Sequence, residues 1–261
     1  MDEIKPITEN RLRFLAADKK FGLYYLEKDY YLTALLYFLK DVPSLCFKGG
    51  TALNKIFLNH KRLSEDLDFT CTGSLEKTKQ AILETVEGHK EFFTGTKFDK
   101  QTPNFFRLKI TYKTITDLRP EIVVDVNKQA SVYLKPQKYK IPHFYDEIPE
   151  FDVSTLDKKE LIAEKVRALF QRKKARDYFD LYSIIQEKIT IDLALVKKKL
   201  KDVNKKFVVE QVFKNANKVY RNWEPEISAL TNKPIGYKTA ITAIAKHFKY
   251  KQTKKSKTAK K

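Results

Sequence analysis

The stretch FKGGTALNKIFLNHKRLSEDLDF, residues 47–69, decides how this chain folds. It continues the apolar run 45–47 and soon reaches Gly49 and Gly50, a pair that lets the backbone turn sharply and leaves its N–H groups open to a ligand. Apolar residues then recur at helical spacing from residue 51 to about residue 60. The first N–H groups of a helix have no partner inside it, so this order of strand, turn and helix predicts a seat for phosphate.

Two aspartates, Asp66 and Asp68, stand two residues apart in the next predicted strand. Residues two apart face the same side of a strand, so both carboxylates project together while Leu67 and Phe69 face the core. Two like charges at this distance repel each other unless a cation lies between them. Hard oxygen ligands suit Mg²⁺, so the pair predicts a magnesium site, with Mn²⁺ as the alternative.

A third carboxylate, Asp125, lies among valines in the predicted strand 121–127. An isolated carboxylate in such a strand costs free energy unless it is paired or bound to a metal. The alternatives are that Asp125 lies at an exposed strand end beside Asn127, or that it pairs with Arg119. Glu121 faces the same side of the strand and is the weaker candidate.

A second informative block begins at Asp157, which forms a capping-box pattern with Glu160 and predicts the start of a helix. Its buried stripe consists of Ile162, Val166, Leu169 and Phe170. Lys165 lies at the edge of this stripe, positioned to reach along a wall rather than into water. A further helix is predicted from residue 174, with Asp177 and Asp180 one turn apart.

Taken together, the two blocks resemble the AbiEii/AbiGii-type nucleotidyltransferase toxin family, within the polymerase-beta-like nucleotidyltransferases. The resemblance is carried by KGGTAL followed by SEDLDF, and by EKVRALFQRKKARDYFDLY at residues 164–182. It implies an α/β (α+β) fold, in which a polymerase-beta-like core with a small mixed sheet is followed by a C-terminal helical bundle. It also implies Mg²⁺-dependent transfer of an NMP from an NTP to an acceptor hydroxyl.

The resemblance assigns roles to individual residues. The implied catalytic residues are Asp66, Asp68, Lys165 and Asp177, with Asp180 an equally placed candidate beside Asp177. The implied nucleotide and phosphate ligands are Lys48, Gly49, Gly50, Thr51, Lys165 and Arg176, and the implied metal ligands are Asp66, Asp68 and Asp125. Arg176 suits phosphate because its guanidinium can bind in a bidentate manner.

Structural alternatives stand beside these roles. Arg176, Asp177 and Asp180 could form an ion-pair cluster that holds two helices together. Asp66 or Asp68 could pair with Arg62 or Lys61, and Lys48 could be a surface lysine at the end of a strand. The physical pattern alone leaves these alternatives open.

The formal net charge of +19 favours a polyanionic partner, with RNA or DNA as the first expectation. The alternative is a merely soluble, lysine-rich protein. The family resemblance implies the 3′ end of tRNA as the acceptor, growth inhibition as a toxin or in phage defence, and a cognate antitoxin. Rival hypotheses are a protein or small-molecule acceptor, or a non-catalytic RNA-binding module.

Two further segments allow either packing or nucleic-acid contact. The tyrosine-rich helix 23–40 fits the core, although its rings could stack on bases. The strand 105–115 presents a cationic face, which could contact phosphate or simply lie in water. The face consists of Arg107, Lys109, Thr111 and Lys113.

The domain organisation is predicted from the break near residue 152. Residues 1–152 form the nucleotidyltransferase core, 153–250 a helical domain that completes the active site, and 251–261 a basic disordered tail. The acidic, polar start is no signal peptide and no apolar run reaches the length of a membrane span, so we expect a cytoplasmic protein. Cys46 and Cys71 lack zinc spacing and are predicted to be free and buried.

Overall fold

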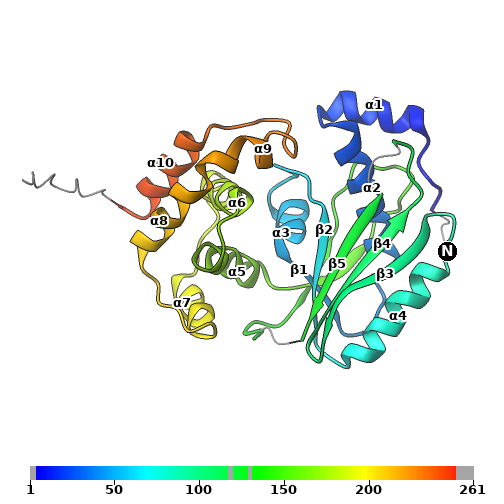
Figure 1. The fold of residues 1–261 in the computed structure, drawn as a ribbon, viewed down its shortest axis with the longest axis horizontal. Coiled ribbons are helices and arrows are strands. Elements are labelled where there is room, and N and C mark those ends of the chain that lie inside the picture. Colours follow the sequence, from blue (N-terminus) through cyan, green and yellow to red (C-terminus); the bar gives the residue numbers. More distant parts are fainter. Residues whose placement is uncertain (1–3, 117–119, 129–130, 251–261) are drawn as a thin grey trace, which may run out of the picture.

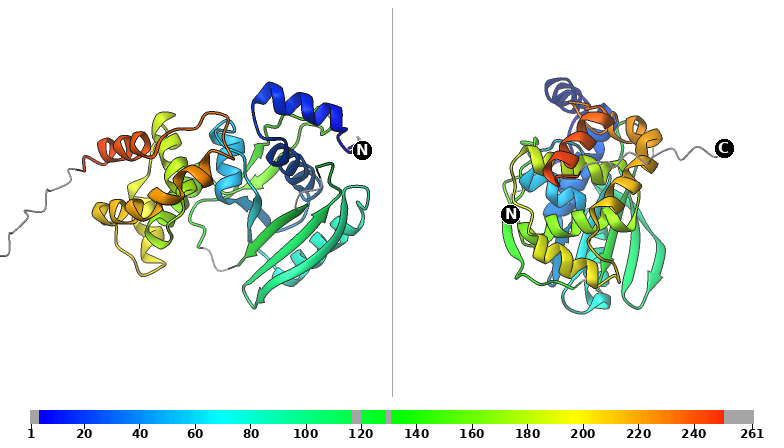
Figure 2. Two further views of the ribbon diagram at one scale, coloured as in Figure 1. Left: turned by 45° about the horizontal axis from the view of Figure 1, so that its top comes forward. Right: turned by 90° about the vertical axis from the view of Figure 1, so that its left-hand side faces the viewer.

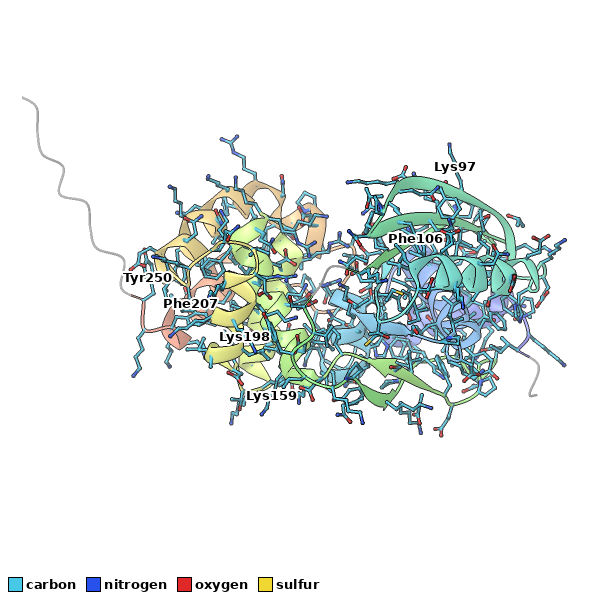
Figure 3. All side chains as sticks on the ribbon, turned by 90° about the horizontal axis from the view of Figure 1, so that it is seen from below. Lys97, Phe106, Lys159, Lys198, Phe207 and Tyr250 are labelled. Atoms are coloured by element: carbon cyan, nitrogen blue, oxygen red, sulfur yellow. The ribbon has the colours of Figure 1, made fainter. Side chains whose placement is uncertain are left out.

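The computed structural model describes residues 4–116, 120–128 and 131–250, arranged as a sheet-containing lobe beside a helical lobe (Figure 1). Arg119, the alternative partner predicted for Asp125, and the basic tail 251–261 lie outside the described residues. The two lobes also lie side by side in the left view of Figure 2. Lys97 marks the sheet lobe, and Lys198 and Phe207 mark the helical lobe, in the view from below (Figure 3).

The first lobe is built on a seven-stranded mixed sheet in the order β3-β4-β5-β2-β1-β7-β6. Its strands are β1 (Leu45–Lys48), β2 (Asp66–Cys71), β3 (Phe93–Thr102), β4 (Phe105–Tyr112), β5 (Glu121–Asn127), β6 (Gln137–Lys140) and β7 (Asp152–Thr155). At the centre, β2 runs antiparallel to β1 and parallel to β5. The alternating residues of β4 and β5 bury one side of the sheet and leave the other side partly open.

The buried side of the sheet packs against helices from the N-terminal half of the chain. These helices are α1 (Glu9–Lys19), α2 (Leu23–Phe38) and α4 (Leu75–Glu87). Ser74 caps α4, because its hydroxyl accepts a hydrogen bond from the backbone N–H of Lys77. Tyr30 and Tyr31 of α2 are fully buried, so core packing is the correct interpretation for these two rings.

The second lobe consists of α5 (Lys158–Gln171), α6 (Ala175–Gln186), α7 (Leu193–Lys201), α8 (Val209–Val219), α9 (Trp223–Ile227) and α10 (Tyr237–His247). The predicted cap of α5 is present, since the Asp157 carboxylate accepts a hydrogen bond of 2.8 Å from the backbone N–H of Lys159. The apolar stripe of α5, from Val166 to Phe170, lies in a hydrophobic cluster separate from that of the sheet.

Some boundaries differ from the prediction. The helix expected from residue 51 begins two residues earlier, as α3 (Gly49–Ala52), and continues into a π-helical turn (Leu53–Phe57). It ends before residue 60 because Asn59 and His60 both adopt positive φ angles. The helix expected to reach Lys40 ends at Phe38, and the strand expected to reach residue 115 ends at Tyr112.

Two strands were not predicted, because their sequences show no recognisable strand pattern. The edge strand β3 is exposed along almost its whole length, so it has no alternation of apolar and polar residues. β7 is only four residues long.

Lys199 belongs to a basic stretch of the sequence with Lys197, Lys198, Lys201, Lys205 and Lys206, but its environment differs from that of an exposed lysine. Its side chain is fully buried between α7 and α5. There it pairs with Glu160, and with Glu164 at 2.9 Å. Charge along the sequence could not reveal this burial, because the two glutamates lie on another helix.

Cys46 and Cys71 are free and buried, as predicted. None of the helices in the described ranges is long and apolar enough to span a membrane.

Candidate active site

Asp66 and Asp68 lie on the open side of the sheet, on central strand β2. The register places Asp68 between Lys48 of β1 and Asp125 of β5. Within the described residues, neither aspartate side chain makes a hydrogen bond or an ion pair. Arg62 and Lys61 instead bind Asp180 and Glu187, so the alternative that these cations neutralise the aspartates is wrong.

The pKa of the Asp68 carboxyl group is shifted in this environment. Burial raises the pKa of its carboxyl group to about 7, and the charge of Asp66 adds to the rise while Lys48 opposes it. A carboxylate in this setting gains free energy from any cation that binds beside it. The pair therefore has the character of a ligand site rather than of a structural ion pair.

The glycine turn lies directly against Asp68. Gly49 has a φ of +80°, and a Cβ atom built on it would lie 2.1 Å from Asp68 Oδ2. Gly50 is equally confined, since its Cβ would lie 2.7 Å from an Arg62 guanidinium nitrogen and 3.5 Å from Lys165 Nζ. Because neither glycine has a side chain, the backbone of the turn can lie close to its neighbours, and a side chain at either position would fill the remaining space.

Thr51 fixes this turn against the neighbouring strand. Its buried hydroxyl donates a hydrogen bond of 2.6 Å to the backbone carbonyl of Asp66. The side chain that was predicted to bind phosphate therefore holds α3 against β2.

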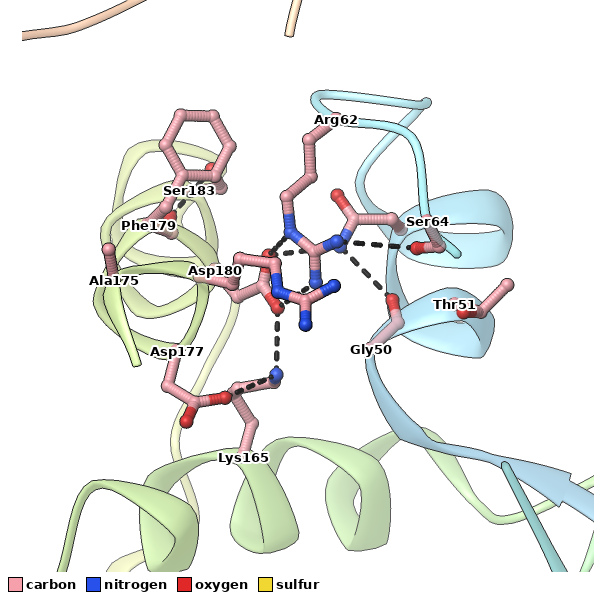
Figure 4. A network of polar contacts seen from close by, with 12 residues as sticks. Gly50, Thr51, Arg62, Ser64, Lys165, Ala175, Asp177, Phe179, Asp180 and Ser183 are labelled. Atoms are coloured by element: carbon pink, nitrogen blue, oxygen red, sulfur yellow. Dashed lines mark hydrogen bonds and ion pairs between the residues drawn. The ribbon is translucent and has the colours of Figure 1, made fainter. Parts of the chain in front are cut away.

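Lys165 reaches from α5 into a buried ion-pair network with α6 (Figure 4). Its Nζ lies 3.0 Å from Asp177 Oδ1 and 2.8 Å from Asp180 Oδ2. Arg62 binds both oxygens of Asp180 at 2.8 Å, and Asn54 donates to the same carboxylate at 3.0 Å. The network joins the glycine-turn segment to the helical lobe.

Asp177 has a second partner, Arg172, whose guanidinium binds both carboxylate oxygens at 2.8 and 2.9 Å. Burial by itself would raise the pKa of Asp180, but Arg62 and Lys165 outweigh it and hold this pKa below its ordinary value. The pKa of Asp177 is likewise lowered against its burial by Lys165 and Arg172. Both aspartates are therefore ionised and fully paired, as the alternative of a structural cluster expected.

Arg176 does not belong to this ion-pair cluster, although the alternative expected it there. It pairs with Glu65 at 3.2 Å and lines a separate cavity of about 330 Å³ beside Tyr25. It contributes to neither the buried network nor the cavity next to the aspartates.

A cavity of about 230 Å³ joins the predicted elements of the site. Its lining includes five residues singled out from the sequence, namely Lys48, Gly49, Gly50, Asp68 and Lys165. Lys48 reaches across it and donates to Asn127 Oδ1 at 3.2 Å. Lys48 is buried, so it is no surface lysine.

The cavity also contains residues that sequence reasoning missed. Arg172, Arg167 and Gln171 line it, together with Glu164. A signal for Arg172 was available, because it stands seven residues after Lys165, two helical turns along the same face of α5. The predicted apolar stripe of α5 lies next to this face, with Lys165 at the edge between the two.

Asp125 is in register with Asp68 but is already occupied. Both of its oxygens bind the Arg107 guanidinium of β4 at 2.7 Å. Arg107 is thus a counterion of Asp125 within the described residues. Among the residues that the structure describes, no three acidic, histidine or cysteine side chains converge as a ready-made metal site.

The donor set nevertheless fits a divalent cation at Asp66 and Asp68. Both are hard oxygen ligands on one face of one strand, and both lack hydrogen-bond partners in the described chain. Burial, together with the charge of Asp66, raises the pKa of Asp68. Asp125 could join them only after Arg107 releases it.

A larger cavity of about 870 Å³ lies between α4 and β3. Its lining includes Glu84, Glu87 and Lys90 but none of the paired aspartates or glycines discussed above. Its lining brings no such set of carboxylates, glycines and lysines together, so the smaller cavity is the candidate active site.

Comparisons with known proteins agree with the fold described above. No curated protein matches the chain. Among solved structures, the nucleotidyltransferase toxin MenT4 from Mycobacterium tuberculosis H37Rv is 22% identical, with a TM-score of 0.68 over 94% of this chain and 89% of that one.

Two Helicobacter pylori structures are similar as well. JHP933 is 19% identical, with a TM-score of 0.57 over 88% of this chain and 94% of that one. A putative nucleotidyltransferase is 21% identical, with a TM-score of 0.56 over 88% and 97%. At these identities the likeness shows the fold, and it confirms the predicted α/β class.

The family comparison goes further than the fold. The model of the nucleotidyl transferase AbiEii toxin, of type IV toxin–antitoxin systems, matches residues 31–254, which include both sequence blocks and the whole cavity. The chain therefore belongs to the AbiEii family of nucleotidyltransferase toxins.

Proposed function

We propose that this nucleotidyltransferase moves an NMP from an NTP to a hydroxyl at the 3′ end of tRNA, with Mg²⁺, and thereby inhibits growth in the cytoplasm. The observation that carries the proposal is the convergence of Gly49, Asp68 and Lys165 on one cavity. Membership of a type IV toxin family implies an NTP substrate and a cognate antitoxin.

In this mechanism the glycine turn and the cations of the cavity bind the triphosphate. The backbone at Gly49 and Gly50 approaches closely because no side chain intervenes. Lys165 balances charge that develops on the phosphates, and Lys48 and Arg172 supply further positive charge along the lining. Asp177 and Asp180 act as positioning residues that fix the ammonium group of Lys165.

Asp66 and Asp68 would hold the divalent cation, with Asp125 as the third ligand once Arg107 moves. A bound cation of this kind polarises the α-phosphate, lowers the pKa of the attacking hydroxyl and neutralises the leaving pyrophosphate. In the transfer, the acceptor oxygen bonds to the α-phosphorus and the bond to pyrophosphate breaks. The protein contributes orientation, since both reactants must be held in line.

RNA is favoured over a protein acceptor by the charge of the chain. A formal net charge of +19 attracts phosphodiester backbones and accelerates their association. Protein nucleotidylation and a non-catalytic RNA-binding module remain outcomes of the test below.

The test incubates the purified protein with Mg²⁺, total tRNA and each ribonucleotide in turn, labelled at the α-phosphate. Asp66→Ala and Lys165→Ala are the inactive variants. Lys159→Ala is the matched control, because Lys159 is an exposed lysine on the same helix as Lys165. We expect label in tRNA with the wild type and the control but not with the other two variants.

Label on protein in place of tRNA would show that the acceptor is a protein. No label with any nucleotide, while the protein still binds RNA, would contradict the transferase mechanism. Equal labelling by the wild type and Lys165→Ala would remove Lys165 from the site.

A further inference from the structure

One side of α8 carries basic residues at successive turns, and it lies beside the loop that ends α5. Lys214 and Lys218 stand four residues apart on this helix, and Arg221 follows in the short 3₁₀ turn Tyr220–Asn222. All three side chains are exposed, and so is Lys173 in the α5–α6 loop. We call these four residues, together with Tyr220, the α8 basic face.

The positive charges of this face crowd one another. The charges of Lys173 and Lys214 lower the pKa of Lys218. In the described ranges, none of the four cations forms an ion pair. The neighbouring carboxylates are engaged elsewhere or stand apart: Glu226 accepts from the backbone N–H of Ala175, Glu224 accepts from Ser228, and Glu210 lies one turn before Lys214.

Like charges held this close destabilise one another unless an anion bridges them. A single phosphate could relieve one pair of lysines, whereas a row that follows a helix for two turns suits a row of phosphates. The spacing therefore fits an extended polyanion.

Tyr220 adds an aromatic surface to the row. Its side chain is 60% exposed, which is unusual for a ring of this size. It packs edge-on against Tyr237 at 5.1 Å between ring centroids, and Tyr237 packs in the same way against the buried Trp223 at 5.6 Å. The ring is thus held firmly from one side and open on the other, as a stacking platform for a base requires.

The α8 basic face begins next to a residue that lines the candidate cavity. Arg172 lines the cavity and binds Asp177, yet its side chain is 53% exposed. The next residue along the chain is Lys173 of the α8 basic face. The α5–α6 loop therefore brings the basic face and the cavity that contains Lys165 and Asp68 close together along the chain.

We propose that the α8 basic face binds the acceptor RNA, with Lys173, Lys214, Lys218 and Arg221 on its backbone phosphates and Tyr220 stacked on an unpaired base. This inference rests on the proposed function, because it supplies the docking surface for an RNA acceptor. A row of cations with an exposed aromatic ring beside it favours RNA over an acidic protein, because an acidic protein offers carboxylates but no bases.

The first test measures binding of a fluorescently labelled tRNA transcript to the full chain by anisotropy at several salt concentrations. The variant is the double substitution Lys214→Glu and Lys218→Glu. The matched control is Lys197→Glu with Lys201→Glu, which changes the same charge at the same spacing on exposed positions of α7. We expect the variant to bind at least about tenfold more weakly and to lose roughly two units of the slope of log affinity against log salt, with the control close to wild type. Equal weakening by variant and control would overturn the proposal.

The second test isolates the aromatic contribution. Tyr220→Ala should weaken binding about tenfold, and Tyr220→Phe should restore it, because stacking needs only the ring. Wild-type affinity in Tyr220→Ala would remove Tyr220 from the surface. Displacement of the transcript by poly-glutamate as readily as by unlabelled transcript would instead indicate an acidic protein partner and overturn the RNA assignment.

The same variants separate this inference from the proposed function. Labelled tRNA product at the wild-type rate from Lys214→Glu with Lys218→Glu would overturn the docking surface and leave the transferase intact. RNA binding that depends on the α8 basic face, without transfer by the wild type, would support the surface and contradict the transferase. Binding of the NTP itself should be unchanged in these variants, since none of the altered residues lines the cavity.

Discussion

Gly49 shows how much of this site depends on the absence of one carbon atom. Its φ of +80° is strained for any L side chain, and a Cβ would collide with Asp68. We expect Gly49→Ala to lower the free energy of unfolding by about 2 kcal/mol or more and to abolish NMP transfer. Urea denaturation and the tRNA-labelling assay measure the two effects.

Gly95 supplies the control for this substitution. A Cβ there meets nothing within 4 Å, so Gly95→Ala should keep activity and change stability by no more than about 0.5 kcal/mol. A fully active Gly49→Ala protein would mean that the turn is not the phosphate seat.

His60 gives the chain a pH dependence that is independent of catalysis. Burial lowers its pKa to about 4, and the charge of Lys55 adds to the effect. The unfolded chain then binds more protons than the native one between about pH 4 and its ordinary pKa of about 6.5. Stability must therefore rise with pH across this window, by roughly 3 kcal/mol from this residue.

The measurement compares unfolding free energies at several pH values. Asn tolerates the positive φ of residue 60 and does not titrate, so His60→Asn should flatten the slope between pH 4 and 6.5. His247→Asn, at an exposed position of α10, should leave the slope as it is in the wild type. An unchanged slope in His60→Asn would show that other groups cause it.

At the scale of elements, Asp180 and Lys165 link α5 and α6 to Asn54 and Arg62 in the segment that follows α3. The two residues differ in what remains when each is removed. Asp180→Asn leaves the buried guanidinium of Arg62 without its carboxylate, which should cost about 3 kcal/mol or more. Lys165→Met leaves Asp180 with Arg62 and Asp177 with Arg172, so its cost should be clearly smaller. We nevertheless expect Lys165→Met to lose transfer activity completely.

Denaturation and labelling, performed on the same samples, separate structure from chemistry. Lys159→Met on the exposed side of α5 serves as the control for both readouts. If Lys165→Met unfolds as easily as Asp180→Asn, the lysine acts mainly as a structural counterion. If it folds well and still transfers NMP, the proposed role for Lys165 is wrong.

At the scale of the whole molecule, the cavity is lined by strands of the sheet lobe and by α5 of the helical lobe. An NTP bound there with a divalent cation contacts both lobes and should stabilise the entire chain. At a concentration about one hundred times the Kd, the expected gain is about 2.7 kcal/mol. Thermal unfolding with each NTP, with and without Mg²⁺, measures it.

Asp66→Asn should remove the part of this stabilisation that depends on Mg²⁺, since it removes one proposed ligand. The unliganded variant should be at least as stable as the wild type, because it loses a repulsion with Asp68. A variant that responds to Mg²⁺ and NTP as the wild type does would place the cation elsewhere.

The sequence by itself determined the features that depend on neighbours along the chain. The glycine turn, the paired aspartates on one strand face and the capped helix at Asp157 follow from local geometry and periodicity, and the family resemblance implied the α/β class. Roles implied by family resemblance, and the domain limits at 152 and 250, stay predictions.

The tertiary structure alone decided the partners of the charged residues. Asp180 bonds to Asn54 and Arg62, 126 and 118 positions away, and Asp125 meets Arg107 through the register of two strands. It also buried Lys199 and moved Arg176 out of the cavity. The physical reason is range: a carboxylate binds whichever cation folding brings within about 3 Å, and local sequence rules do not specify contacts across a hundred residues.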